Sequence, residues 1–450
     1  TGVVKVTPAH DFADFEMGLR HNLEAKEVID KFGRLNEKTG PYKGLKVAEA
    51  RTKTAEDLKK KGLIEKIDEN YKHNVAVCYK CEQVLEPRIL PQWFVKMKPL
   101  AAKAMEAVKK GKIKFIPAHF EKTYFHWLQN IKDWNISRQI VWGIRIPAWF
   151  KSIKHQGSGI KAQVEDADEI YIGIKPPEGE GWEQDTDVFD TWFSSAQWPF
   201  LTLGFTAKSS SNSKLKTDLK TFYPTDVMET AYEILFFWVA RMIMMGIYRT
   251  GKTPFKTVYL HGLVRDAFRQ KMSKSKGNVI DPTEVAQVYG TDAMRMSLVA
   301  GNTPGTDLAI SEDKIRGYRN FSTKLWNIAR FVLMSPRPKT AGGPAAPKKL
   351  DMENKKTLQE LEGVKKKVGR QIEGFQFHLA AETIYHYVWH KFADKIIEAN
   401  KVRPNPPLLG YILKECLKML HPFMPFITEA IYQKMPESKG KMLMMEKWES

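Results

Sequence analysis

The amino-acid sequence predicts two consecutive α/β regions followed by an all-α region. Near the start of the chain, a β-branched run at residues 3–6 (VVKV) precedes a segment with helical periodicity. Further along, an apolar run at residues 258–263 (VYLHGL) predicts a strand that enters a charged loop. After residue 350 helical patterning continues to residue 436, with a break at residues 403–407.

The composition favours a polyanionic partner in a reducing compartment. Among 450 residues, 71 Lys and Arg stand against 52 Asp and Glu, which gives a formal charge of +19. Nucleic acid is the usual partner of such a chain, and a membrane surface is the weaker alternative because no basic amphipathic anchor stands out. Only three cysteines occur, which excludes a disulfide framework, so we expect a cytoplasmic protein.

In the first half of the chain, a predicted helix follows Asp11 and ends near Asn22. A short cysteine-containing hairpin and a helix at residues 96–109 come next. Residues 206–221 are rich in Ser and Lys and almost free of large apolar side chains, which predicts a solvated loop.

In the second half, residues 227–248 predict one apolar helix. Its most apolar stretch, residues 234–248, is interrupted by Arg241 and is too short to span a bilayer. After the strand at residues 258–263 and its charged loop, a helix should begin at Pro282 or Thr283. A Pro- and Gly-rich stretch at residues 336–349 has the composition of a linker.

The charged loop, residues 271–277 (KMSKSKG), places three lysines within six positions among small residues. A mobile loop of this kind can fold over a polyphosphate and neutralise charge that builds up on a leaving group. A solvated basic loop is the alternative for an arbitrary Lys-x-x-Lys run. The whole string KMSKSKGNVIDP, after a strand and His261-Gly262, favours the phosphate-binding interpretation.

This string and several others resemble class I aminoacyl-tRNA synthetases, in which the KMSKS loop closes on ATP. The resemblance extends over nearly the whole chain, and the strings point to the valine-specific group. The matching stretches are TGVVKVTPAHDFADFEMGLRHNL, ISRQIVWGIRIPAWF, DTWFSSAQWPF, ILFFWVARMIMMG, VYLHGLVRD and IRGYRNFSTKLWNIARF.

The resemblance implies the second half of a Rossmann-type nucleotide fold with part of an inserted editing domain, followed by a helical bundle. Residues 1–73 would form the C-terminal half of the editing domain, residues 74–310 the second half of the catalytic domain, and residues 311–450 the anticodon-binding domain. The family's HIGH signature is not found in the chain. We therefore expect an upstream segment to be missing and the isolated chain to form no valyl-adenylate.

The implied reaction joins valine to tRNA(Val) through a valyl-adenylate, with ATP and Mg²⁺ as the nucleotide substrate. The resemblance also implies hydrolysis of mischarged threonyl-tRNA, because an apolar pocket cannot strongly reject a hydroxyl-bearing mimic of valine. A monomer is expected. Two alternatives are a non-catalytic tRNA-binding module and an isoleucine-specific synthetase.

The resemblance also assigns nucleotide-site residues. Those of the lysine loop contact the pyrophosphate side of ATP, and those at the strand ends contact adenine and ribose. They are Lys271, Lys274, Ser273 and Ser275 in the loop, and His261, Gly262 and Glu233 at the strand ends. Gly262 would allow close approach of the base.

The amino-acid side chain would lie between Trp192, Ile234 and Trp238. The alternative for Ile234 and Trp238 is an ordinary i, i+4 pair on a buried helix face. Two departures from the family concern the neighbouring nucleotide site. Ala231 and Glu233 stand where the family has Gly-x-Asp, and Arg269 stands where it has Gly before KMSKS, which puts the usual turn geometry in doubt.

Two acidic residues near the start match the editing site. Asp14 corresponds to the carboxylate that pairs with the ammonium group of the misattached amino acid. Asp11 also belongs to the matching string, but Asp-x-x-Asp at a helix start is a capping pattern, so we expect Asp11 to accept backbone N–H groups.

Cys78 and Cys81 have the spacing of a two-ligand zinc knuckle. A closed structural site needs four ligands, and the chain has no second Cys-x-x-Cys pair. His10, His73 or His155 could contribute, but two free or buried thiols are the favoured interpretation, and no metal is expected.

Overall fold

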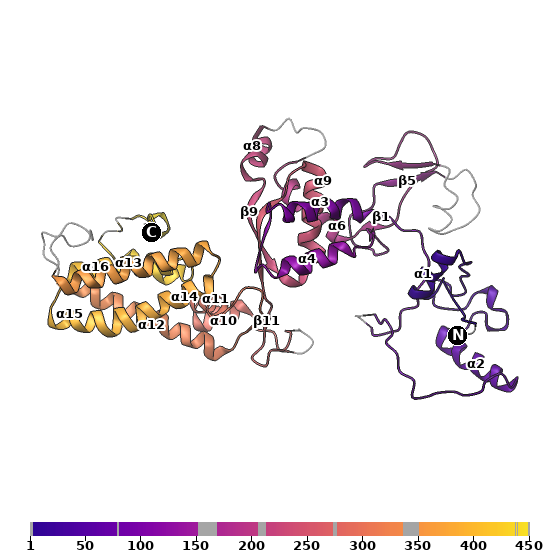
Figure 1. Ribbon diagram of the computed structural model, residues 1–450, viewed down its shortest axis with the longest axis horizontal. Helices are drawn as coiled ribbons and strands as arrows, with labels where there is room; N and C mark the ends of the chain where they lie inside the picture. Colours follow the sequence, from indigo (N-terminus) through magenta and orange to yellow (C-terminus); the bar gives the residue numbers. More distant parts are fainter. Residues whose placement is uncertain are drawn as a thin grey trace. The chain divides into compact units, whose positions relative to one another are not determined.

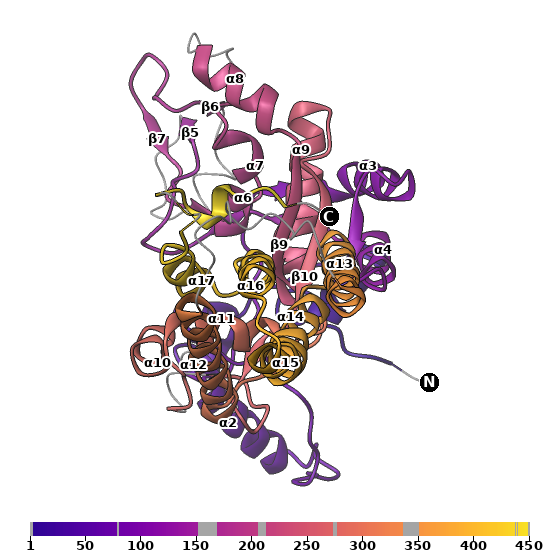
Figure 2. The same ribbon diagram turned by 90° about the vertical axis from the view of Figure 1, so that its left-hand side faces the viewer.

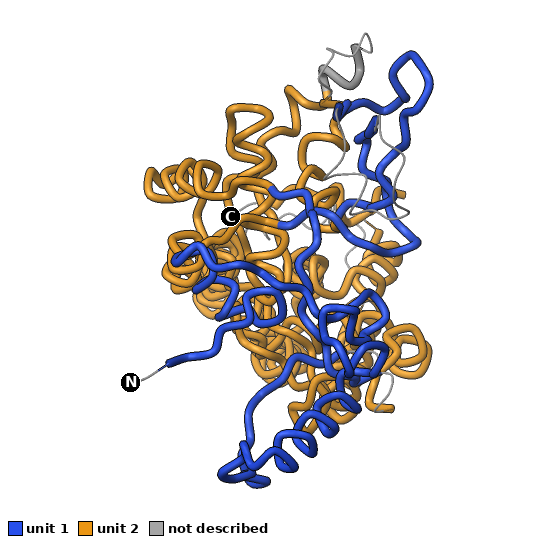
Figure 3. Tube along the Cα trace, turned by 90° about the vertical axis from the view of Figure 1, so that its right-hand side faces the viewer, with its two compact units in different colours: residues 1–94, 135–189 blue, residues 95–134, 190–450 orange. Residues whose placement is uncertain are grey.

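The computed structural model describes residues 3–78, 81–151, 169–205, 213–272, 277–335, 351–436, 438 and 440–448, with only the backbone for 213–217. The chain divides into two compact units (Figure 3). One comprises residues 1–94 and 135–189, and the other comprises residues 95–134 and 190–450. The short strands β1 (Phe94–Val95) and β3 (Trp134–Asn135) lie where the chain passes from one unit to the other.

The N-terminal part of the first unit contains α1 (Phe12–His21), a 3₁₀ turn η1 (Glu37–Tyr42) and α2 (Val47–Lys60). Helix α1 begins after Asp11 and ends at Asn22 with a φ of 51°, which confirms the predicted helix. The predicted strand at residues 3–6 is wrong, because these residues join no ladder and Val3 and Val4 are exposed. A β-branched run forms a strand only when another strand pairs with it.

The remainder of the first unit is antiparallel. Strand β5 (Ala148–Lys151) lies between β6 (Glu169–Ile172) and β7 (Trp182–Gln184), and β4 (Ser137–Arg138) pairs with β8 (Val188–Phe189). Ile146, Ala148 and Phe150 form a small buried cluster against Trp93 and Phe189. The predicted cysteine hairpin is confirmed by a β-bridge between Val77 and Val84.

The second unit contains a parallel sheet with the order β2-β10-β9. Its strands are β2 (Lys114–Ile116), β9 (Thr225–Ala231) and β10 (Phe255–His261). Val258 and Leu260 of the central strand point to the same face of the sheet and are fully buried, so this face is covered. The predicted strand at residues 258–263 is thus confirmed, although it begins and ends earlier.

Helices pack around this sheet (Figure 1). Helix α9 (Arg241–Thr250) packs against α3 (Met97–Lys109) and the short helices α6 (Thr191–Ser195) and α7 (Trp198–Leu201). Helix α4 (Phe120–Gln129) packs against α3 as well. The helix predicted at residues 96–109 is therefore confirmed as α3.

Two predictions in this unit are corrected. Residues 227–248 are not one helix: β9 continues to Ala231, followed by a 3₁₀ turn η2 (Tyr232–Ile234), a π-helical segment η3 (Leu235–Ala240) and then α9. A short apolar run is ambiguous between strand and helix, and pairing with β10 decides it. Within the predicted loop 206–221, residues 206–212 lie outside the described residues, and α8 (Ser213–Phe222) is helical.

The sheet is followed by helices. After β11 (Val264–Arg265) come α10 (Pro282–Tyr289) and α11 (Thr291–Val299), then β12 (Leu308–Ala309), which pairs with β11, and α12 (Glu312–Met334). Helix α10 begins at Pro282 with Asp281 as its N-cap, which confirms the predicted start. The predicted linker 336–349 lies outside the described residues.

The C-terminal helices lie side by side with α12 (Figures 1 and 2). They are α13 (Met352–Glu373), α14 (Phe377–His386), the π-helical η5 (Tyr387–Ile397), α15 (Glu398–Val402), α16 (Pro406–Leu420), α17 (Pro425–Tyr432) and the 3₁₀ turn η6 (Leu443–Met445). The predicted break at residues 403–407 separates α15 from α16. The predicted all-α region is thus confirmed.

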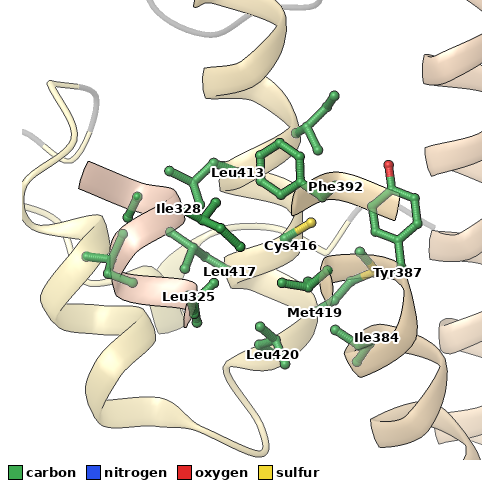
Figure 4. Packing of buried hydrophobic residues seen from close by; sticks show 14 of the residues in the cluster. Leu325, Ile328, Ile384, Tyr387, Phe392, Leu413, Cys416, Leu417, Met419 and Leu420 are labelled. Carbon is green, nitrogen blue, oxygen red and sulfur yellow. The ribbon is translucent and has the colours of Figure 1, made fainter. Parts of the chain in front are cut away.

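A single apolar core holds these helices together (Figure 4). Leu325 and Ile328 of α12 meet Ile384 of α14 and Cys416 and Leu417 of α16. Cys416 is completely buried, and burial raises the pKa of its thiol, so this cysteine packs as a small apolar group. No helix of the described chain has both the length and the apolar character needed to cross a membrane.

Candidate functional site

The carboxyl ends of β9 and β10 lie next to each other, because Ala231 pairs with His261. In open parallel sheets, ligands bind beyond the carboxyl ends of the strands. Register therefore brings Glu233, which follows β9, to the same edge as His261 and Gly262. Ala231 adopts φ −66° and ψ 142°, so the absent glycine costs nothing in backbone conformation at this position.

The first lysine of the predicted phosphate loop reaches this edge. Lys271 Nζ lies 3.7 Å from Glu233 Oε2, and both side chains are exposed. An exposed pair of this kind contributes little stability. The pair is informative for its position, because it brings together two residues that were predicted to contact different parts of the nucleotide. Ser273, Lys274 and Ser275 lie outside the described residues.

Two acceptors orient His261 at the end of β10. Its Nε2 lies 3.2 Å from Glu229 Oε1 on the neighbouring strand, and its Nδ1 lies 2.7 Å from the carbonyl oxygen of Gly262. The ring is partly exposed, with 39% of the side chain accessible. It is therefore held in one orientation while one face remains open to a ligand.

Gly262 is needed for a reason that the sequence does not reveal. A Cβ atom at this position would lie 1.8 Å from the carbonyl oxygen of Thr306 and 2.6 Å from the backbone nitrogen of Asp307. Both are backbone atoms that cannot rotate away. The glycine thus permits close packing of the 306–307 segment. If a nucleotide base also approaches this position, that approach would be a second reason for a glycine here.

Asp307 is a structural centre that the sequence did not single out. Its Oδ1 accepts the backbone N–H of Leu263 and the hydroxyl of Tyr232, each at 2.9 Å, and its Oδ2 pairs with Arg265. Burial alone would raise the pKa of Asp307, but these hydrogen bonds outweigh burial and lower the pKa. The carboxylate therefore joins the end of β10, the residue after β9 and the strand that leads into the lysine loop.

The entrance to the lysine loop is a tight hairpin. Arg265 and Lys271 form an antiparallel bridge, and Asp266 Oδ1 accepts the N–H groups of Phe268 and Gln270 at 3.0 and 2.7 Å. Arg269 has a φ of 61°, a left-handed conformation that favours glycine. The turn therefore keeps a glycine-like backbone despite the substitution, at a conformational cost of about 1 kcal/mol.

The three predicted pocket residues lie on neighbouring elements, because η3 contacts both η2 and α6. Trp192 lies on α6, Ile234 ends η2, and Trp238 lies in the π-helical segment η3. All three are half-buried, unlike a pair inside a packed core. Trp238 Nε1 donates to the carbonyl oxygen of Ser195 on α6 at 3.1 Å, so the elements carrying the two tryptophans are directly joined. π-Helical segments are frequently found at functional sites.

In the first unit, the two predicted editing residues have different local roles. Asp11 accepts the N–H groups of Ala13 and Asp14 at 2.8 and 2.9 Å, which confirms that it caps α1. Asp14 Oδ2 accepts the backbone N–H of Thr7 at 2.6 Å and its hydroxyl at 3.0 Å. These bonds, the backbone one first, lower the pKa of Asp14, so it is a carboxylate at neutral pH.

The candidate zinc ligands that the structure describes do not form a cluster, and His155 lies outside the described residues. Cys78 is half-buried, Cys81 is exposed, and among the described residues no group of three His, Cys, Asp or Glu side chains could hold a metal. His10 has other partners: the backbone N–H of Val28 donates to its Nε2 at 2.9 Å, and its Nδ1 lies 2.8 Å from the carbonyl oxygen of Pro87. Both ring nitrogens are therefore occupied.

Comparison with known proteins gives two family matches. Residues 3–311 match the family of tRNA synthetases class I (I, L, M and V), and residues 354–450 match the anticodon-binding domain of tRNA ligase. Together the two matches span nearly all of the chain.

Curated relatives are named valine–tRNA ligases. The relative from Carboxydothermus hydrogenoformans is 44% identical over 457 residues, covering 100% of this chain and 50% of its own length. The relative from Bacillus subtilis is 42% identical, again covering 100% of this chain and 50% of its own length. The chain thus spans about half the length of the curated relatives that it matches.

Solved structures share the fold at low sequence identity. Methionyl-tRNA synthetase of Mycobacterium tuberculosis in complex with methionyl-adenylate matches 81% of this chain and 67% of its own chain, with a TM-score of 0.60 and 16% identity. A leucyl enzyme of Agrobacterium radiobacter in a ternary complex matches 71% of this chain and 43% of its own, with a TM-score of 0.54 and 21% identity. With the match over residues 3–311, which is more than half of the chain, the conclusion is that this chain belongs to the class I tRNA synthetases of the I, L, M and V group.

Proposed function

We propose that this protein is a valine–tRNA ligase that activates valine with ATP and transfers the valyl group to tRNA(Val). The observation that carries this proposal is the meeting of Lys271, Glu233 and His261 at one sheet edge, where β9 leads directly into the segments η2 and η3 that carry Ile234 and Trp238. The names and the 42–44% identity of the curated relatives support valine as the substrate.

In the proposed activation step, the valine carboxylate attacks the α-phosphorus of ATP and pyrophosphate leaves. Because the substrates react directly with each other, catalysis depends on positioning them and on neutralising charge on the leaving group. Lys271, with Lys274, Ser273 and Ser275, would act on the pyrophosphate side. His261 and Gly262 would hold the adenine.

Glu233 would accept hydrogen bonds from the ribose hydroxyls. Its exposed carboxylate stands directly after β9, and its pairing with Lys271 at 3.7 Å would orient it before ATP binds. Mg²⁺ would arrive on the phosphates of ATP, because this ion keeps most of its water and binds few protein groups.

The amino-acid side chain would lie between Trp192, Ile234 and Trp238. Rigid indole walls and one branched aliphatic residue suit a small branched side chain. Trp238 is held by its bond to Ser195, so this wall would not need to be ordered when valine binds.

The domain assignment follows from the same proposal. Residues 1–73 would belong to an editing domain, 74–310 to the catalytic domain and 311–450 to a tRNA-binding helical domain. Asp14 would pair with the ammonium group of a misattached threonine through Oδ1, since Thr7 occupies its Oδ2. The +19 charge of the chain suits tRNA as the partner.

The test is valine-dependent exchange of pyrophosphate into ATP by the complete product of the gene that encodes this chain. We expect exchange with valine to be at least about tenfold more efficient than with isoleucine. We expect Lys271→Ala to lower exchange about 100-fold. The exposed Lys252, which lies in the turn after α9, is the matched control, and Lys252→Ala should exchange normally.

Each alternative predicts a different result. A non-catalytic tRNA-binding module would bind tRNA without exchange for any amino acid. An isoleucine enzyme would prefer isoleucine. Either result would overturn the proposed function.

A further inference from the structure

A buried ion pair joins the residue before α6 to the first residue of α9. Arg241 Nη1 lies 3.8 Å from Asp190 Oδ2, and only 10% and 8% of these side chains are exposed. Neither residue is among the proposed contacts of valine or ATP. Burial of two charges is costly and is often no more stabilising than an apolar pair, so a positional role is the better explanation.

Asp190 attaches the helix that carries one pocket wall. As the N-cap of α6, it accepts the backbone N–H of Trp192 through Oδ1 at 3.2 Å. Through Oδ2 it accepts the indole N–H of the buried Trp134 at 2.9 Å. Trp192 is therefore held through its backbone by a carboxylate that is itself fixed by Trp134 and Arg241.

Arg241 extends this arrangement to the other wall. As the first residue of α9, it directly follows the π-helical segment that carries Trp238. Its guanidinium carbon lies 3.8 Å from the ring centroid of Trp134 and 5.7 Å from that of Phe237, within the range of cation–π attraction. Phe237 in turn stacks on Trp192, with ring centroids 5.9 Å apart and planes inclined by 27°.

Besides this stacking, two polar attachments connect α6 to the η3–α9 segment. One is the bond from Trp238 Nε1 to the carbonyl oxygen of Ser195, at the C-terminal end of α6. The other is the Asp190–Arg241 pair, at the N-terminal end of α6. With both ends of a five-residue helix fixed, the separation between Trp192 and Trp238 is fixed as well.

We propose that Asp190 and Arg241 are positioning residues that set the width of the amino-acid pocket and hence the size of side chain it accepts. This inference rests on the proposed function, because it takes Trp192 and Trp238 as pocket walls. A loosened pocket would hold valine less firmly and would exclude isoleucine, which is one methylene larger, less well.

The experiment compares variants of the complete gene product in pyrophosphate exchange. Arg241→Met keeps most of the side-chain length but removes the charge. Asp190→Asn also removes the charge but keeps only one acceptor oxygen, so it can serve the cap at Trp192 or the indole of Trp134 but not both. The double variant removes the unpaired charge that each single variant leaves. Lys256→Met is the matched control, because it breaks an exposed ion pair with Asp226 between β10 and β9 of the same unit.

We expect Arg241→Met to raise the KM for valine about tenfold and to lower the preference for valine over isoleucine by a similar factor. The KM for ATP should stay within about twofold, because the nucleotide edge is untouched. A residue that only stabilised the fold would lower the amount of active protein and leave both KM values and the preference unchanged. The double variant should be less impaired than the sum of the single variants, and Lys256→Met should match the wild type.

Unchanged preference in both folded single variants would overturn the inference while leaving the proposed function intact. Wild-type protein without valine-dependent exchange would instead overturn the proposed function and, with it, the pocket assignment. If Arg241→Met does not fold, Asp190→Asn decides the question, because it removes the charge of the pair at the cost of one accepted hydrogen bond. Thermal unfolding of each variant identifies that case.

Discussion

Replacing Gly262 with alanine should uncouple the nucleotide edge of the sheet. The added Cβ would lie 1.8, 2.1 and 2.6 Å from three backbone atoms of Thr306 and Asp307, so the 306–307 segment must move. That movement would break the bond from Leu308 N to Leu263 O and the bond from Leu263 N to Asp307 Oδ1, both 2.9 Å long.

The magnitude follows from these contacts. Overpacking against rigid neighbours costs about 1–3 kcal/mol, and each lost hydrogen bond costs about 1 kcal/mol. We therefore expect Gly262→Ala to lower the free energy of unfolding by about 3–5 kcal/mol. For a unit of about 300 residues, that corresponds to a Tm lower by roughly 5–8 °C.

The assay is thermal unfolding of the purified chain, followed by circular dichroism, with Gly317→Ala as the control. Gly317 lies in α12, and no atom lies within 4 Å of the position that an alanine Cβ would take there, so alanine should be neutral or stabilising by about 0.5–1 kcal/mol. A Gly262→Ala chain as stable as the wild type would refute the packing argument. In the complete gene product, the same substitution should also raise the KM for ATP, because His261 is adjacent.

Three further predictions concern stability. Glu415→Gln should destabilise the helical bundle by about 1–3 kcal/mol, because it removes one of the two carboxylates that lie 2.9 Å from the buried Lys365 ammonium, the other being that of Glu362. Glu398→Gln, in an exposed pair, should cost less than about 1 kcal/mol, and equal Tm values would contradict this. Burial lowers the pKa of His421 below 6.5. Its contribution to stability is therefore present above pH 6.5 and is lost as the pH falls through the folded-state pKa. His421→Gln should flatten this part of the curve of Tm against pH, and an unchanged slope would exclude His421 as its origin. Arg269→Gly should stabilise the hairpin by about 1 kcal/mol, because glycine adopts a φ of 61° without strain. Urea unfolding would measure this gain. A loss of stability would show that contacts of the arginine side chain compensate for its strained backbone.

Local signals in the sequence determined the elements whose ends depend only on nearby residues. Asp11 and Asn22 bound α1, and Asp281 with Pro282 starts α10, because caps and prolines act within a few positions of the backbone they satisfy. The all-α character of the C-terminal region was also predictable, since its apolar periodicity is repeated over many turns. The proposed pocket and nucleotide residues came from matching strings, each of which is short and local.

Tertiary structure alone decided the features that depend on a distant partner. Residues 3–6 have strand propensity but pair with no strand, and residues 227–231 form β9 because β10, which follows further along the chain, pairs with them. The same is true of Asp190 with Arg241 and of Gly262 with Thr306. Neither pairing produces a periodic or compositional signal in the sequence, because the effect of a buried charge or a missing Cβ depends on the atoms that the fold places next to it.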